Sequence, residues 1–140
     1  LLENTAGTKN SMGSSFEDIQ EILDHVTARF RVAVCFDTCH AFGAGYDLRD
    51  EQSVEKTVAE LKETVGLESL RVIHANDSKG ELASGLDRHE HIGMGHIGEQ
   101  GFRAMLHNDV FRKVPLILET PIDKRATDIT NLRKLRELAA

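Results

Sequence analysis

Four short apolar segments, each ending in a polar residue able to bind a metal, restrict the fold of this chain more than any other feature. They end, in chain order, at Glu3, Asp37, His74 and Glu119, which lie 34, 37 and 45 residues apart. Each interval has room for a helix and a returning strand, because a β-strand–helix–β-strand unit takes roughly 30 residues or more. The pattern predicts parallel strands with crossover helices and places the four polar side chains together where the strands end.

Apolar periodicity between these segments supports the same arrangement. Apolar residues recur at helical spacing in four stretches, 19–30, 54–65, 102–106 and 129–138. Ser14 and Glu17 have the spacing of a capping box, which predicts the start of the first helix. Strands are expected over 1–4, 32–36, 70–73 and 114–118.

Two connections lack such periodicity. Residues 41–46 are mostly small and are expected to form a loop, and residues 80–98 are expected to form a long irregular connection. Connections of that length inside compact domains are usually functional or disordered. The longer one is therefore a place to search for further site residues.

Chain length decides how much of a barrel these units can make. An α/β barrel of eight units takes about 250 residues, whereas this chain has 140 residues and four units. It also opens on Leu1-Leu2-Glu3 without a methionine, inside an expected strand. The predicted fold class is α/β, a (β/α)8 TIM barrel of which this chain supplies about half, and we expect a fragment of a longer protein.

Net charge, the length of apolar runs and cysteine content bear on whether the chain binds nucleic acid, spans a membrane or contains disulfides. The net charge of −6 argues against a nucleic-acid partner, since phosphate binding usually leaves a basic surface, unless many of the acids are metal ligands. No apolar run approaches the roughly 20 residues that a membrane span needs, and no signal peptide is evident. Cys35 and Cys39 are too close in sequence to close a useful disulfide loop, so we expect packed thiols and a cytoplasmic location.

The donor atoms at the four strand ends are oxygens and nitrogens, which suit Zn²⁺, Mn²⁺ or Fe rather than a thiolate site. Asp87-Arg88-His89 adds two donors on one side of an extended segment, because side chains alternate along such a segment. His40 is a third candidate for the same ion. The alternatives are hydrogen-bonded polar residues at strand ends and a surface loop in which Arg88 pairs with an acid.

Five segments together closely resemble endonuclease IV, the zinc-dependent apurinic/apyrimidinic endonuclease of base excision repair. They are LLENTAG at 1–7, FDTCHAFGAGYD at 36–47, HANDSK at 74–79, DRH at 87–89 and LILET at 116–120. The resemblance runs from Leu1 to at least Pro121. It implies a TIM barrel that holds three zinc ions, with Mn²⁺ or Fe as possible substitutes.

The resemblance also implies roles for individual residues. Glu3 corresponds to a carboxylate that bridges two of the three zinc ions. Asp37, His74 and Glu119 correspond to ligands of one zinc ion of that bridged pair. His40, Asp87 and His89 correspond to the protein ligands of the third zinc ion. Two further histidine ligands belong to the family's first four βα units, which nothing here matches. Residues 1–140 are thus expected to be the C-terminal half of a single catalytic domain.

The implied activity is hydrolysis of the phosphodiester 5′ to an abasic site in duplex DNA. Glu119 and Glu3 are the expected catalytic residues, and Lys79 and Arg88 are candidates for phosphate contact. The expected partners are damaged duplex DNA and the N-terminal half of the same barrel, in a monomeric full-length enzyme. His25, His91, His96 and His107 are not expected to be ligands.

Two other interpretations remain open. A sugar isomerase or epimerase on a similar barrel also places Glu, Asp, His and Glu at successive strand ends, but around one metal. Such an enzyme has no use for a second donor set at His40, Asp87 and His89. Alternatively, the chain is an inactive half-barrel whose two strand edges pair with another chain.

Overall fold

The computed structural model describes all of residues 1–140 and contains a four-stranded parallel sheet in the order β1-β2-β3-β6. Its strands are β1 (Leu2–Glu3), β2 (Val34–Asp37), β3 (Leu70–His74) and β6 (Leu116–Ile117). A short antiparallel pair, β4 (Asp77–Ser78) with β5 (His89–Glu90), lies beyond the end of β3. The predicted repeat of parallel strands and crossover helices is confirmed.

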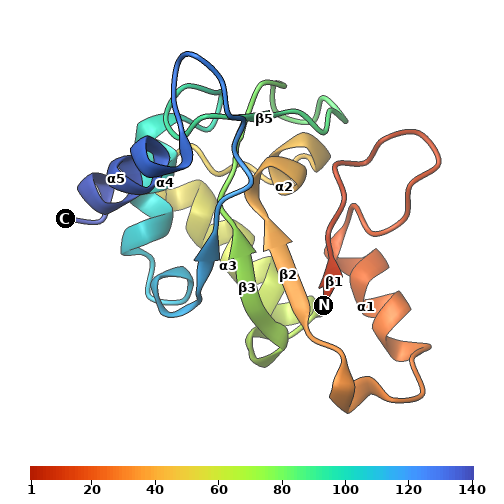
Figure 1. The fold of residues 1–140 in the computed structure, drawn as a ribbon. Coiled ribbons are helices and arrows are strands. Elements are labelled where there is room, and N and C mark those ends of the chain that lie inside the picture. Colours follow the sequence, from red (N-terminus) through yellow and green to blue (C-terminus); the bar gives the residue numbers. More distant parts are fainter.

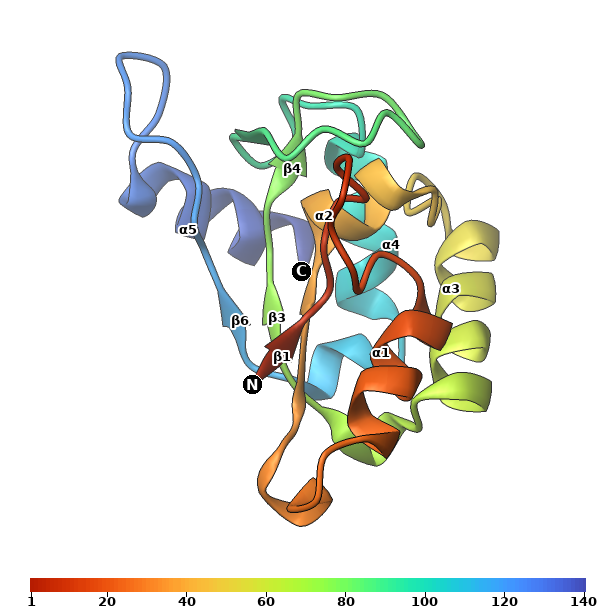
Figure 2. The same ribbon diagram turned by 90° about the vertical axis from the view of Figure 1, so that its right-hand side faces the viewer.

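Five helices accompany the strands: α1 (Phe16–Asp24), α2 (Thr38–Ala44), α3 (Glu51–Thr64), α4 (Gly98–His107) and α5 (Asp128–Leu138). Three single 3₁₀ turns, 29–31, 67–69 and 111–113, precede strands. Helices α1, α3 and α4 cover one face of the sheet, and α5 packs beside α4 (Figure 2). None of the helices combines the length and apolar character that a membrane span requires.

The main core lies between the sheet and this row of helices. Phe36 of β2 stacks on Phe111 with ring centroids 5.3 Å apart and meets Phe16 of α1 at 6.2 Å. Leu61 of α3 and Phe102 of α4 are fully buried in the same cluster. Each such side chain contributes roughly 1.5–3 kcal/mol on burial. Packing therefore fixes the face of the sheet that carries the helices, and the polar residues Asp37 and His74 lie where its strands end.

The sheet holds its polar strand ends at a common level. Asp37 and His74 are direct partners in the β2–β3 register, and His74 is the partner of Ile117, two residues before Glu119. The connection that carries β5, together with α2, lies over these ends (Figure 1). Parallel pairing thus brings residues far apart in sequence to one place.

Several predicted boundaries are wrong. The first helix is capped by Ser15, whose hydroxyl accepts the Asp18 N–H at 3.1 Å, rather than by Ser14. It ends at Asp24, and Phe30, assigned to its apolar face, is 89 % exposed. The second strand begins two residues later and ends one residue later than the predicted 32–36, and the fourth is limited to Leu116–Ile117.

The expected loop at 41–46 is largely helix. Asp37 caps α2, because its side chain accepts the His40 N–H at 2.8 Å, and α2 ends before Gly45, whose φ of 114° suits glycine. The helix is only seven residues long, too short for a periodic apolar pattern to mark it. The strand-end carboxylate is thus also the start of the next helix.

The apolar face predicted for the last helix is correct only in its C-terminal part, where Leu135 and Leu138 are buried. Ile129 and Leu132, assigned to its apolar stripe, are 62 % and 45 % exposed. The buried residues of α5 are Asn131, Leu135 and Leu138. A polar side chain, Asn131, occupies the inward position because it has hydrogen-bonding partners there.

The sheet has two open edges. β1 pairs only with β2, and β6 pairs only with β3. Leu1, Leu116 and Ile117 at these edges are substantially exposed. An open parallel sheet with apolar residues at both edges differs from a closed barrel, in which every strand has two neighbours.

Candidate metal centre

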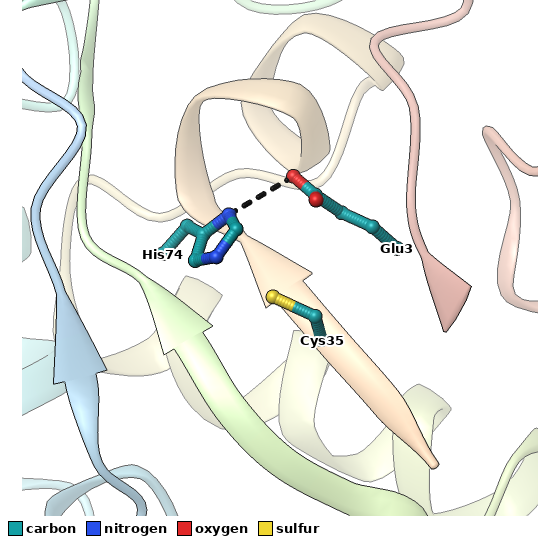
Figure 3. A group of neighbouring side chains, drawn as sticks. All are labelled: Glu3, Cys35 and His74. Carbon is teal, nitrogen blue, oxygen red and sulfur yellow. Dashed lines mark hydrogen bonds and ion pairs between the residues drawn. The ribbon is translucent and has the colours of Figure 1, made fainter. Parts of the chain in front are cut away.

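The strand ends form one compact group of donors, which we call the strand-end group: Glu3, Asp37, His74 and Glu119. One ligand atom from each lies within 4.8 Å of the others. His74 Nδ1 is 3.1 Å from Glu3 Oε1 and 3.0 Å from Glu119 Oε2. Figure 3 shows the side chains of Glu3 and His74 pointing toward each other. A single imidazole thus stands among three carboxylates, a charge arrangement that a divalent cation would balance.

A second set, the loop group, consists of His40, Asp87 and His89, whose donor atoms also lie within 4.8 Å of one another. Asp87 Oδ1 is 3.2 Å from His40 Nε2 and 3.5 Å from His89 Nε2. The two imidazole rings are 5.5 Å apart between centroids. The structure therefore brings together both sets of residues predicted from the sequence.

Backbone carbonyls orient both histidines of the loop group. His40 Nδ1 is 2.9 Å from the Asn4 carbonyl, and His89 Nδ1 is 3.0 Å from the Glu119 carbonyl. A carbonyl oxygen only accepts, so each Nδ1 carries the proton and each Nε2 keeps a free lone pair. Both lone pairs face Asp87. Metal-binding histidines are commonly held in this way, with the second ring nitrogen donating to a carbonyl.

One buried atom lacks any hydrogen-bond partner, and it is His89 Nε2. Its nearest acids, Asp87 Oδ1 at 3.5 Å and Asp37 Oδ2 at 3.8 Å, are beyond good hydrogen-bond distance. An unpaired buried acceptor is costly unless something else binds it. This atom, together with the donor chemistry around it, fits a bound divalent metal ion.

The electrostatics of His40 show that a positive charge is favoured at the loop group. Burial alone would lower the pKa of His40, but the nearby carboxylates of Asp37 and Asp87 and the Asn4 carbonyl outweigh it. The pKa of His40 is consequently raised above its ordinary value. The same field that favours a proton there would favour a metal cation.

The connection that carries Asp87 and His89 is irregular apart from the two-residue strand β5, as predicted, but hydrogen bonds hold it in place. Its strand β5 pairs with β4, which lies just before the connection, and the Lys79 N–H donates to the Arg88 carbonyl at 2.9 Å. Its middle is fastened to the end of α2, where Ala83 and Gly85 donate to the carbonyls of Phe42 and Gly43 at 3.0 and 2.9 Å. The loop group is therefore built on a docked segment.

Asp77 fixes the far end of this connection and was not predicted as important. The carboxylate is fully buried and accepts backbone N–H groups from Ser78, Gly93, Gly95, Ile97 and Gly98. Burial raises the pKa of Asp77, although these donors oppose the rise. The only sequence signal was the run of glycines at 93, 95 and 98, where backbone approaches the carboxylate closely.

Both cysteines lie next to the donor groups without a disulfide. Cys35 Sγ is within 4.8 Å of donor atoms of Glu3 and His74 (Figure 3), and Cys39 is similarly close to Asp37 and His89. Burial first, and then nearby carboxylates, raise the pKa of Cys35 to about 12. The pKa of Cys39 is raised to about 11, chiefly by burial. Both are neutral packed thiols near neutral pH.

The two candidate phosphate contacts lie beside the loop group. Lys79 and Arg88 are both exposed, and neither forms an ion pair with an acid. Arg88 therefore does not have the acidic partner that the surface-loop alternative assumed. Their ammonium and guanidinium groups are free to meet an anion.

The other histidines are divided between surface and interior. His25, His96 and His107 are exposed. His91 is fully buried, with Nε2 3.0 Å from Asp123 Oδ1 and Nδ1 3.0 Å from Asn131 Nδ2. Asn131 also accepts the Ile92 N–H and donates to Thr120. His91 thus joins the docked connection to α5.

The fold and these groups agree with what the sequence is similar to. The profile of a family described as "Xylose isomerase-like TIM barrel" matches residues 1–139. The chain belongs to this family. The TIM-barrel fold class predicted from the sequence is thereby confirmed.

Relatives within this family confirm the resemblance to endonuclease IV. "Probable endonuclease 4" of Methanoculleus marisnigri is 55 % identical over 99 % of this chain and 49 % of its own length. "Apurinic-apyrimidinic endonuclease" of Caenorhabditis elegans is 46 % identical over 89 % of this chain and 31 % of its own. The crystal structure of endonuclease IV from Thermus thermophilus superimposes with a TM-score of 0.84 at 37 % identity, covering 99 % of this chain and 48 % of that one. The chain spans about half the length of the curated relatives it matches.

Proposed function

We propose that this chain is the C-terminal half of a zinc-dependent DNA repair endonuclease that hydrolyses the phosphodiester 5′ to abasic sites in duplex DNA. The observation that carries the proposal is the pair of donor groups, strand-end and loop, side by side at one end of the sheet. The names of the relatives support the same activity. The full-length enzyme would act as a monomer.

The proposal that residues 1–140 form half of one domain rests on coverage and on the sheet. Relatives continue for about as many residues again, and the open edges of β1 and β6 offer pairing to further strands. The missing half would supply two histidine ligands beside Glu3 and part of the DNA-binding surface. Residues 1–140 alone are therefore proposed to be nearly inactive.

Seven residues of this chain are proposed to hold three zinc ions together with that half: Glu3, Asp37, His40, His74, Asp87, His89 and Glu119. Zinc, with Mn²⁺ or Fe as substitutes, would supply an activated water and neutralise charge developing on the phosphate. His40 and His89 present Nε2 because their Nδ1 protons are donated to carbonyls. Asp37 is oriented by the start of α2.

Orientation of the attacking water and contact with the DNA phosphates are assigned to carboxylates and to exposed cationic side chains of this chain. Glu119 is 46 % exposed at its side chain and Glu3 35 %, so both are accessible to substrate. We propose that they orient the attacking water. Lys79 and Arg88 would contact phosphates flanking the abasic nucleotide, which is expelled from the stack at smaller cost than an intact one.

The rival activity is that of a one-metal sugar isomerase or epimerase, and the family description is the observation that favours it. The strand-end group alone would satisfy such an enzyme. The loop group would then have no role. Removing the loop group by Asp87→Asn therefore separates the two proposals.

The test uses the full-length protein and a duplex with one abasic site. We expect a nick on the 5′ side that leaves a 3′ hydroxyl, abolished by chelation and restored by zinc. Asp87→Asn should lower cleavage at least tenfold, and Glu119→Gln at least as much. A duplex with an intact nucleotide at the same position is the control. Interconversion of aldose and ketose sugars by a protein that leaves abasic DNA intact would refute the proposal.

A further inference from the structure

The amide of Asn76 connects two residues of the strand-end group without itself being a donor to that group. It lies two residues past the end of β3 and is fully buried. Its Nδ2 donates to Asp37 Oδ2 at 2.7 Å, and its Oδ1 accepts the Glu119 N–H at 2.9 Å. The side chain thus spans from the end of β2 to the segment that follows β6.

The orientation of this amide is not ambiguous. A backbone N–H only donates, so the atom facing Glu119 N must be the oxygen, and the NH₂ therefore faces Asp37. The backbone of Asn76 is also fixed, since its N–H donates to Thr38 Oγ1 at 2.9 Å and its carbonyl accepts that hydroxyl at 2.6 Å. Hydrogen bonds within the protein therefore fix both the backbone and the side-chain amide of Asn76.

The Asp37 carboxylate has no rotational freedom left as a result. Oδ1 accepts the His40 N–H at 2.8 Å, and Oδ2 accepts Asn76 Nδ2. Each oxygen retains a second lone pair, and Oδ2 lies 3.8 Å from His74 Nδ1 within the group. Hydrogen bonds of this kind fix the direction in which a carboxylate offers its remaining lone pair, and losing them typically costs 10–100-fold in metal affinity.

We propose that Asn76 is a positioning residue of the strand-end group: its amide fixes the Asp37 carboxylate and the backbone of Glu119 relative to each other across β3. The inference rests on the proposed function only in that this group binds a metal. The residue touches neither substrate nor metal and acts through Asp37 and Glu119.

The decisive variant is Asn76→Asp in the full-length protein. It keeps an acceptor for the Glu119 N–H but turns the donor to Asp37 into a like charge. We expect chelator competition to show about 10–100-fold weaker zinc binding. The kcat for abasic-site cleavage should fall by a similar factor, with KM changed less than about threefold. Asn76→Ala, which removes both contacts, should be at least as severe.

Ser78→Ala is the matched control. Ser78 is in the same stretch and is fully buried, and its hydroxyl forms two hydrogen bonds with Gly80 and none with either donor group. Its backbone pairs with His89 in the β4–β5 ladder, and the substitution keeps that backbone pairing. We expect a loss of stability with zinc affinity within about threefold of the unsubstituted protein. Zinc binding weakened equally by Ser78→Ala and Asn76→Asp would overturn the positioning role.

A second measurement needs no substitution at the site and covers the case in which Asn76→Asp fails to fold. In NMR spectra of the unsubstituted protein, the side-chain NH₂ resonance of Asn76 should shift on zinc binding. That of Asn131, an equally buried amide outside both groups, should not. An unmoved Asn76 resonance would refute the proposal. Weakened zinc binding by Asn76→Asp in a protein that does not cleave DNA would instead refute only the proposed function.

Discussion

The two donor groups are built by different means. The strand-end group is positioned by the sheet: Asp37 and His74 are register partners, and their strands pack on the core through Phe36 and Ile73. The loop group is positioned by hydrogen bonds from a connection of about twenty residues to α2, to Asp77 and to α5. Disturbing the connection should therefore damage the loop group and spare the strand ends, because only the former depends on polar anchors.

The largest effect is expected from Asp77→Ala. It leaves five buried or partly buried backbone N–H groups without their acceptor, and each orphaned donor costs about 1–3 kcal/mol unless water reaches it. We expect a loss of about 3–5 kcal/mol in urea unfolding. Hydrogen exchange should accelerate over residues 80–98 and stay slow over β2. Equal acceleration in both segments would show that the two regions are not independent.

His91→Ala and His89→Ala should have opposite consequences although the residues are two positions apart. His91 is buried against Asn131 and Asp123, so its removal should cost about 2–4 kcal/mol of stability and change zinc affinity little. His89→Ala should change stability by less than about 1 kcal/mol and lose one zinc by elemental analysis. Zinc loss in the His91 variant instead would make His91 the ligand.

Gly43→Ala tests the contact between α2 and the connection. A Cβ at residue 43 would lie 3.0 Å from the Leu86 carbonyl oxygen and 3.3 Å from Ala6 Cβ. Alanine favours helix over glycine by about 1 kcal/mol, so any net loss must come from displacing the connection. We expect net destabilisation of about 1 kcal/mol and roughly tenfold weaker zinc binding at the loop group. Net stabilisation in thermal melts would contradict the close contact.

The smallest effect is expected from Asp123→Asn, and it should depend on pH. Hydrogen bonds from Arg125, and then from His91, hold the pKa of Asp123 well below its ordinary value. A carboxyl with a depressed pKa stabilises the fold above its unfolded pKa of about 4 and loses this contribution as the pH falls. The variant should thus be slightly less stable than the unsubstituted protein at pH 7, and the difference should vanish on acidification. Asp109→Asn, beside Arg112, controls for loss of a surface charge.

The difference between the strand-end group and the loop group also explains which parts of the site could be predicted from the sequence. Strand ends can be predicted from the sequence, because an apolar run followed by Asp37 or His74 is a local pattern. Parallel pairing of the strands then brings such residues together. The residues alone offered His40 only as a candidate for the same ion as Asp87 and His89, and the resemblance to a family then implied that the three form one group. Nothing local shows that residue 87 returns to residue 40, since that depends on where the connection docks.

Buried polar residues were the least predictable. Asn76, Asp77 and Asn131 have their roles only through partners distant in sequence, and a single chain does not display those partners. Asn131 is also the inward-facing residue of the first half of α5, where Ile129 and Leu132 had been predicted to be buried. The helix α2 was missed for a related reason: its start is set by Asp37, which already had a role as a strand end.

That double use of Asp37 limits which amino acids can occupy the position. Serine, threonine and asparagine would start α2 equally well but carry no negative charge. Glutamate has the charge, but its longer side chain is a poor cap and would not keep the 2.8 Å contact to His40 N and the 2.7 Å contact to Asn76 Nδ2 together. In a saturation library at residue 37, only aspartate should therefore be functional. Second-site suppressors should not be recoverable, because no one replacement restores both the helix start and the proposed metal ligand.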